Sequence, residues 1–387
     1  MKARFLPGID VLLASRRLDG LRVGLVSHTA ALAASGATSA EALQSDGHFK
    51  LAALFAPEHG FFGAAGAGDP VANRRHPVWR IPVYSLYGRR LAPTPAHFRG
   101  LDALVVDLQD LGARCYTYVS TLRHCLAAAA RAGKPVFVAD RPIPLPVTPD
   151  GPVLQPGFES FVGCVRTPLA YAMTPGETAL WLDADLELDL DLSVIPMSGY
   201  GRDARRGTDW PPWVPPSPGI RSWETAACYL ATVFTEAIPA VSCGRTTPLP
   251  FQIFGAPWMK AEAVREILED ERLPGVAFHP HPFIPPSDPY AGRLIAGLRL
   301  VVTDPRRFRP ALTSVAIVAA LQRLHGRRRV WNAPGTRPEW FDKLYGTDAF
   351  RLALLDGEPP ARIALAWSKD LARFGKARSR VLLYPAR

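Results

Sequence analysis

The sequence predicts a two-domain α/β protein whose N-terminal part is built on a parallel sheet. The 387 residues exceed what one hydrophobic core usually supports. Short apolar runs alternate with helical stretches in the first half of the chain, which is typical of a parallel sheet with helices on both faces. Hydrophobic residues make up 48% of the chain and charged residues 21%, as in an ordinary folded protein.

Four apolar runs predict the strands of this sheet. They are Leu21–Val26, Leu51–Phe55, Ala103–Val106 and Pro135–Ala139. Between the last two, Ser120–Ala132 is rich in alanine and is followed by Gly133, the residue that most often ends a helix. We therefore expect strand–helix–strand units in the order that gives parallel pairing.

A proline-rich segment separates the two predicted domains. Trp210–Pro218 contains five prolines in nine residues, so it forms neither a helix nor a central strand. We expect a catalytic domain over residues 1–209, an ordered linker over 210–225 and a smaller mixed α/β domain over 226–387. In the smaller domain the sequence predicts helices at Ala226–Ala237, Ala311–Leu324 and Asp348–Leu355, and a strand at Leu294–Thr303.

Composition disfavours several classes of protein. No apolar run reaches the roughly 18 residues of a membrane span, and the N-terminal residues lack the apolar core of a secretory signal, so we expect a cytoplasmic protein with no membrane partner. The five cysteines are scattered and form no CxxC pair, which argues against disulfides and zinc. The net charge of +10 is dispersed in short arginine runs, so nucleic-acid binding is disfavoured.

Nucleotide cofactors are disfavoured as well. Gly63–Gly68 is rich in glycine, but its spacing is GxxGxG and it does not lie directly between a strand and a helix, as the dinucleotide fingerprint requires. A P-loop is absent. The glycine-rich segment is better interpreted as a flexible loop beside the site.

Polar residues gather at one edge of the predicted sheet. His28, Glu58, Asp107, Asp110 and Asp140 all follow the carboxyl ends of predicted strands. In an open parallel sheet this edge is where ligands bind, because the loops there form the crevice. Each residue alone could simply cap the following helix, but five on one edge favour a functional site.

Carboxylates and aromatic residues together favour carbohydrate hydrolysis. A glycosidase needs two carboxyl groups that flank the scissile oxygen, and Glu177 and Glu236 add to the strand-end set. Aromatic surfaces for sugar rings could come from Tyr84, Tyr87, Tyr116, Tyr118, Trp210, Trp213 and Trp223, although tyrosines at strand ends are often packing residues. An alternative is a metal-dependent hydrolase that uses Glu58, Asp107 and Asp110.

Five motifs resemble, in order, those of the bacterial exo-β-N-acetylmuramidases, long catalogued as a domain of unknown function. The motifs are Ala56–Gly60, Pro82–Gly88, Asp107–Tyr118, Asp140–Pro142 and Trp213–Pro218. The resemblance implies a Rossmann-like first domain, a smaller second domain, an active-site cleft between them and no cofactor. It also implies release of terminal N-acetylmuramic acid from peptidoglycan fragments, so the expected partner is an amino sugar or a muropeptide.

The resemblance also bears on individual residues. It places the glutamate of the family's Glu-His-Gly motif at Glu58, and the lactyl carboxylate of muramic acid would suit Arg114 or Arg141. The chain departs from the family pattern at Tyr171, within a stretch where Arg-His-Gly is usual, and at Cys243, where a glutamate is usual.

Taken together, these observations predict a catalytic set and a substrate-binding set. The catalytic residues are Glu58, His59, Asp110 and Glu236, with no metal. The substrate-binding residues are His28, Asp107, Arg114, Tyr116, Tyr118, Asp140, Arg141, Glu177 and Arg245. The order of proton transfer, the stereochemical course and attack by the substrate's own acetamido group stay open. A non-catalytic sugar-binding protein is the other alternative, because of the departures at Tyr171 and Cys243.

Overall fold

A parallel sheet forms the centre of the N-terminal lobe. The computed structural model describes residues 4–144, 148–202, 212–287 and 290–384. Its largest sheet has the order β3-β4-β2-β1-β5-β6-β9, and all neighbours are parallel except β3 and β4. The strands are β1 (Arg22–Val26), β2 (Lys50–Ala56), β3 (Arg74–Arg75), β4 (Pro82–Ser85), β5 (Ala103–Val106), β6 (Val136–Ala139) and β9 (Leu192–Ile195). The four predicted strands are confirmed as neighbours in this sheet.

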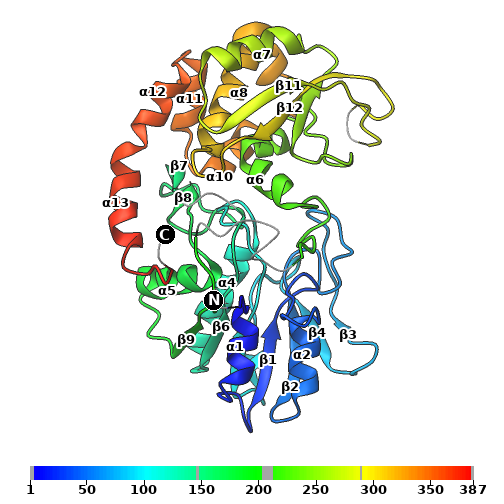
Figure 1. Ribbon diagram of the computed structural model, residues 1–387, viewed down its shortest axis with the longest axis vertical. Helices are drawn as coiled ribbons and strands as arrows, with labels where there is room; N and C mark the ends of the chain where they lie inside the picture. The colour runs from blue at the N-terminus through cyan, green and yellow to red at the C-terminus, as the bar shows by residue number, and fades with distance from the viewer. Residues whose placement is uncertain (1–3, 145–147, 203–211, 288–289, 385–387) are drawn as a thin grey trace.

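Helices cover both faces of the sheet, as the alternating pattern predicts (Figure 1). Ile9 and Leu43, from α1 and α2, pack with one set of strand side chains, and Leu126 and Leu182, from α4 and α5, pack with the other. The predicted helix after β5 is α4, and its boundaries differ by one or two residues from the prediction. The helices are α1 (Gly8–Ala14), α2 (Ser39–Asp46), α3 (Pro95–Phe98), α4 (Tyr118–Arg131) and α5 (Pro175–Leu186).

The C-terminal lobe packs helices against a three-stranded antiparallel sheet of order β10-β12-β11. Its strands are β10 (Ile253–Ala256), β11 (Val276–Pro280) and β12 (Ala296–Val302). Its helices are α6 (Trp223–Thr232), η1 (Val233–Glu236), α7 (Ala261–Asp270), α8 (Pro310–His325), α9 (Arg327–Val330), α10 (Pro338–Tyr345), α11 (Ala349–Leu355), α12 (Pro360–Ala366) and α13 (Ser368–Arg378). The predicted helix 226–237 is interrupted, because α6 tightens into the 3₁₀ turn η1.

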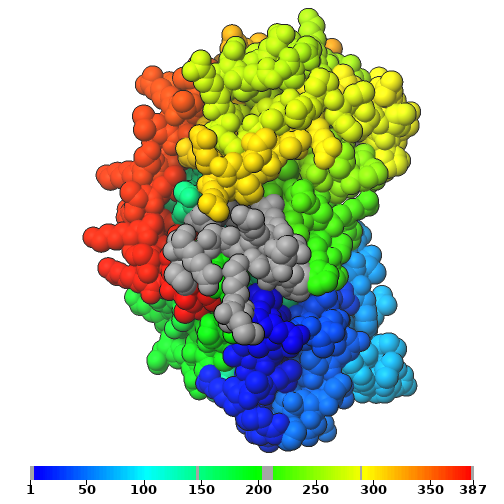
Figure 2. All heavy atoms as spheres, viewed as in Figure 1, coloured from blue at the N-terminus to red at the C-terminus, as the bar shows by residue number. Residues whose placement is uncertain are grey.

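Two chain segments tie the lobes together. The hairpin of β7 (Asp150–Val153) and β8 (Pro168–Ala170) lies between the lobes and contacts α8 and α13 (Figure 1). The C-terminal helices then run back along one side of the molecule toward the first lobe, where they form the red flank in Figure 2. The Phe374 ring of α13 lies 4.9 Å from the Trp181 ring of α5.

The predicted linker 210–225 begins outside the described residues, at Trp210 and Pro211. Residues 212–222 form neither helix nor strand, and α6 begins at Trp223, so the last three residues of the predicted linker are helical. The domain boundaries stay a prediction. Among the described residues, no helix has both the length and the apolar character needed to cross a bilayer.

The contact of Tyr384 with the sheet edge gives a stability test. Its hydroxyl donates to Asp140 Oδ2 at 2.6 Å and accepts from the Met197 amide at 2.8 Å. Tyr384→Phe leaves buried partners unsatisfied, so we expect the free energy of unfolding to fall by about 1.5–3 kcal/mol. Urea denaturation measures this fall in the free energy of unfolding. Tyr84→Phe is the control, since this hydroxyl has no hydrogen-bond partner within the described residues; an equal loss in both variants would contradict the role of Tyr384.

Candidate active site

The carboxylate of Glu58 is held by two loops of the N-terminal lobe. Glu58 lies two residues after β2 and is 8% exposed. Its Oε1 accepts from the Gly68 amide at 2.8 Å, and its Oε2 accepts from Thr117 Oγ1 at 2.6 Å. Thr117 directly precedes α4. Both oxygens are therefore oriented by donors from segments that are far apart in the sequence.

The backbone beside Glu58 takes a sparsely populated conformation. His59 has φ 70° and Gly60 has φ 76°, and a positive φ is uncommon outside glycine. His59 Nδ1 lies 2.9 Å from the Ala65 carbonyl, which fastens the turn to the glycine-rich segment. Such conformations cluster at functional sites. The glycine-rich loop lies beside Glu58, as the sequence predicts, because the Gly68 amide donates to the Glu58 carboxylate.

Tyr87 lies beside Glu58, although the sequence did not predict it as a catalytic or substrate-binding residue. Burial raises the pKa of its hydroxyl to about 12, and the negative charge of Glu58 and a hydrogen bond to Glu58 add to the effect. The hydroxyl is therefore neutral at physiological pH and available as a donor. The sequence carries a signal for Tyr87, which lies in the Pro82–Gly88 motif, but aromatic composition alone predicts only a surface for sugar rings.

Glu236 brings a second carboxylate from the C-terminal lobe. It is the last residue of η1 and forms an ion pair with Arg245, whose guanidinium lies 5.0 Å from the Phe251 ring centroid. The side chain keeps 26% of its surface exposed. Burial nevertheless raises the pKa of Glu236, the charge of Arg245 opposes the shift, and the charge of Glu58 adds to it. Glu58 and Glu236 are thus close enough to influence one another.

Asp107 and Asp140 lie at the predicted sheet edge, but both point into the protein. Asp107 forms a two-bond ion pair with Arg141, and both side chains are at most 2% exposed. Asp140 accepts from Thr174 Oγ1, Tyr384 and two backbone amides, and burial raises its pKa to about 6. These carboxylates have structural partners in this structure.

Arg114 and Glu177, predicted to bind substrate, are also fully buried. The Arg114 guanidinium donates to the carbonyls of Pro152, Thr167 and Tyr345, with distances of 2.9, 2.5 and 2.6 Å. Arg114 therefore joins the β7–β8 hairpin to α10. Glu177 completes the capping box of α5 and pairs with Arg202. A substrate carboxylate would have to displace these bonds to reach Arg114.

Asp110 and His28 form a second buried group near the sheet edge. Asp110 accepts from the Tyr171 hydroxyl, and burial raises its pKa to about 6. His28 Nε2 accepts from the Gln109 amide at 3.0 Å, and burial lowers the pKa of its imidazole to about 3. His28 is therefore a neutral acceptor. The departure at Tyr171 thus supplies a direct partner for a predicted catalytic aspartate.

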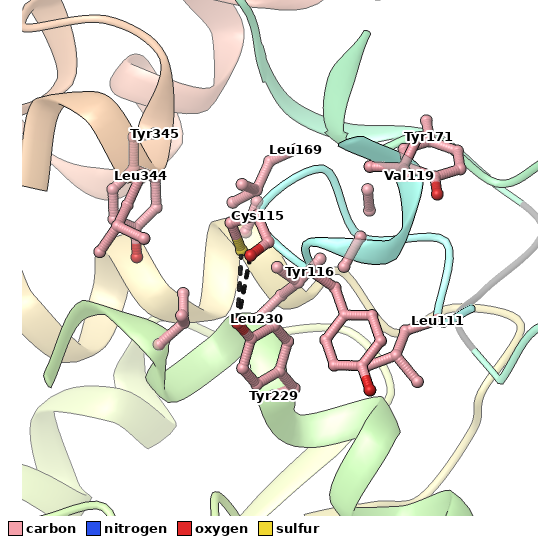
Figure 3. Close-up of a cluster of buried hydrophobic side chains, with 14 of the residues drawn as sticks. Leu111, Cys115, Tyr116, Val119, Leu169, Tyr171, Tyr229, Leu230, Leu344 and Tyr345 are labelled. Atoms are coloured by element: carbon pink, nitrogen blue, oxygen red, sulfur yellow. Dashed lines mark hydrogen bonds between the residues drawn. The ribbon is translucent and has the colours of Figure 1, made fainter. Parts of the chain in front are cut away.

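The predicted aromatic pair Tyr116 and Tyr118 is part of the core. Their ring centroids are 4.7 Å apart, and Tyr118 donates to the Pro216 carbonyl at 2.5 Å. Figure 3 shows Tyr116 beside Leu111 and Tyr229 in a buried cluster, in which the Cys115 thiol is hydrogen-bonded to the Tyr229 hydroxyl. The exposed fractions of Tyr116 and Tyr118 are 6% and 1%, so the packing interpretation describes them better than a sugar platform does.

The carboxylates proposed for a metal centre are not brought together. Glu58, Asp107 and Asp110 each have separate partners. Over the described ranges, no group of three or more His, Cys, Asp and Glu side chains is arranged to hold a metal ion. The arrangement that can do chemistry is instead the pair Glu58 and Glu236, with Tyr87 and Arg245 beside them.

Comparison with known proteins places the chain in a family. Residues 23–224 match the family model described as exo-beta-N-acetylmuramidase NamZ, N-terminal, and residues 227–384 match its C-terminal counterpart. The chain belongs to the NamZ family. It is 35% identical over 386 residues to the peptidoglycan beta-N-acetylmuramidase NamZ of Bacillus subtilis (strain 168). This match covers 99% of this chain and 92% of that relative.

Two solved structures of DUF1343 family proteins from Bacteroides fragilis are similar to this NamZ-family chain. Their TM-scores are 0.92 and 0.79, their identities are 29% and 26%, and each match covers 99% of both chains. These values, with the two matched family domains, confirm the predicted α/β class and the two-domain architecture.

The buried Asp107–Arg141 pair predicts a structural effect of mutation. Asp107→Ala leaves the Arg141 charge buried without its partner, so we expect the free energy of unfolding to fall by about 3–5 kcal/mol. The double variant Asp107→Leu/Arg141→Met removes both charges, so its free energy of unfolding should fall by less than that of Asp107→Ala. Urea denaturation of both variants tests this, with the exposed Asp270→Ala as a control expected within about 0.5 kcal/mol of wild type. An Asp107→Ala variant as stable as the Asp270→Ala control would contradict the expectation.

Proposed function

We propose that this protein is a glycoside hydrolase that releases terminal N-acetylmuramic acid, or a related amino sugar, from peptidoglycan fragments in cell-wall turnover or recycling. The observation that carries the proposal is that Glu58 and Glu236, from the two lobes, lie close enough for the charge of Glu58 to raise the pKa of Glu236. Membership of the NamZ family supports the substrate class, as does the name of the relative from Bacillus subtilis. The muropeptide binds between the lobes. The cytoplasmic location stays a prediction.

The two carboxylates have environments suited to different roles. Glu58 has both oxygens occupied by donors from Gly68 and Thr117, which holds it in place to stabilise positive charge on the sugar or to activate its attacker. Burial raises the pKa of Glu236, as a general acid requires near neutral pH. In this proposal Glu236 protonates the departing glycosidic oxygen and Glu58 acts at the anomeric carbon. Tyr87 orients Glu58 as a neutral hydrogen-bond donor.

The departure at Cys243 is compatible with this assignment. Cys243 is buried, and the pKa of its thiol is raised by burial and, to a smaller extent, by the charge of Glu236. Glu236 therefore lies close to the position where the resemblance implies a glutamate. A carboxylate is still present at this corner of the site, contributed by a neighbouring segment, and this supports catalysis over binding alone.

Replacing each carboxylate by its amide tests the assignment. We expect Glu58→Gln and Glu236→Gln each to lower kcat on a chromogenic β-N-acetylmuramide by about 10²–10⁴-fold, because each removes a proton-transfer or charge-stabilising group. Glu266→Gln, on the exposed surface of α7, is the matched control and should keep wild-type kcat. Wild-type protein that binds the muramide without turnover would instead identify a sugar-binding protein.

The pH profile separates the role of Glu236 from a structural one. The charge of Arg245 lowers the pKa of Glu236, so Arg245→Gln should raise that pKa. If Glu236 is the general acid, activity is lost as pH rises through its pKa, and the alkaline limb of kcat therefore moves to higher pH. Arg245→Lys keeps the charge and should restore the original limb. An unmoved limb in Arg245→Gln would argue against proton donation by Glu236.

A further inference from the structure

A basic and aromatic hollow lies in the C-terminal lobe outside the carboxylate pair. Its volume is about 780 Å³, which falls in the range of roughly 300–1,000 Å³ typical of ligand sites. Its lining includes the rings of Trp258 and Tyr290 and the side chains of Arg293, Arg328 and Arg329. These residues come from the segments after β10, before β12 and in α9.

The charged residues among the described lining of this hollow are all basic. No aspartate or glutamate is among the described residues that line it, and Arg293, Arg328 and Arg329 have no ion-pair partner in the described part of the chain. The Arg293 guanidinium lies 5.9 Å from the Tyr290 ring centroid, which orders one arginine against an aromatic face. A guanidinium fork matches a carboxylate in two bonds. Three such groups around one hollow therefore fit a ligand with carboxylates.

Two chain segments connect the hollow to the proposed catalytic acid. Ala240 lines the hollow four residues after Glu236, so the two Cα atoms are at most about 15 Å apart, and the Tyr290 hydroxyl donates to the Ala240 carbonyl at 2.8 Å. The second segment runs from Asn332, also in the lining, to Arg337. Arg337 donates to the carbonyl of Glu236 at 2.8 Å through Nη2. The hollow therefore lies within about 15 Å of the Glu236 backbone, in the same lobe as the proposed acid.

We propose that this hollow binds the carboxylate-bearing peptide stem on the departing part of a peptidoglycan fragment. A general acid lies next to the leaving group, so a hollow that lies near Glu236 in the same lobe is placed to receive the part of the substrate beyond the scissile bond. Arg293, Arg328 and Arg329 bind the carboxylates, and Trp258 and Tyr290 provide flat surfaces for the rest. This inference rests on the proposed function and adds a second binding region to it.

The test compares two substrates that differ beyond the scissile bond. One is a small aryl β-N-acetylmuramide, whose leaving group bears no carboxylate, and the other is a peptidoglycan fragment with a free-carboxylate stem on its departing part. For Arg328→Glu/Arg329→Glu we expect the ratio of kcat/KM for the fragment to that for the aryl muramide to fall about tenfold, or about 1.4 kcal/mol. The fall should be smaller at high salt, because exposed charges are screened.

The control variant makes the same change in net charge as Arg328→Glu/Arg329→Glu, but away from the hollow. Arg306→Glu/Arg307→Glu reverses two adjacent exposed arginines that do not line the hollow, and it should leave the ratio as in wild type. A fragment whose stem carboxylates are amidated should show no difference between Arg328→Glu/Arg329→Glu and wild type. An equal fall in both double variants, or an unchanged ratio in both, would overturn the proposal.

Binding measurements keep this test separate from the proposed function. If the wild type hydrolyses neither substrate, the proposed function fails, and calorimetry with the same fragment still examines the hollow. We expect the Kd of the fragment to rise about tenfold in Arg328→Glu/Arg329→Glu, and not in the Arg306→Glu/Arg307→Glu control. Equal Kd values for the wild type and the hollow variant would overturn the proposal by themselves.

Discussion

The need to pair charges buried at the carboxyl edge of the parallel sheet organises the N-terminal lobe. The Asp107–Arg141 pair joins the loop after β5 to the loop after β6, and Arg141 also donates to the Leu32 carbonyl at 2.8 Å, in the segment after β1. A buried ion that loses its partner costs several kcal/mol, so these loops are held in one arrangement. The loop after β5 continues to Thr117, which orients Glu58. The position of the proposed catalytic carboxylate thus depends on charges that do not touch it.

The strands and their shared edge could be predicted because they depend on local patterns. Apolar runs predict strands, and a glycine predicts the end of a helix, from residues that are close together in the sequence. The carboxyl ends of parallel strands must then meet at one edge of the sheet. Which polar residue faces the substrate depends on partners far away in the sequence. Asp107 and Glu58 occupy equivalent places after their strands, yet Asp107 meets a buried arginine while Glu58 meets Gly68 and Thr117. No local pattern distinguishes these two environments.

The second lobe also shows that local sequence patterns do not predict every feature of the structure. Composition predicts a continuous helix over 226–237, but α6 tightens into η1, which ends at Glu236. A 3₁₀ turn has three residues per turn in place of 3.6, so the tightening changes the direction of the last side chains. The role of Tyr87 is hard to predict from sequence for a related reason. Its significance comes from proximity to Glu58, which aromatic composition does not reveal.

Arginine serves two opposite purposes in this chain, and the partners of each arginine decide which. Arg114 and Arg141 are buried and donate hydrogen bonds to protein acceptors, so their positive charge is used to join segments. Arg328 and Arg329 lie at the surface around a hollow without an acidic lining residue among those described, so their charge acts on what arrives from solvent. Net charge alone does not separate these uses. A field of one sign attracts acidic ligands only where protein carboxylates have not already neutralised it, and the described lining of the C-terminal hollow, which contains no carboxylate, meets that condition.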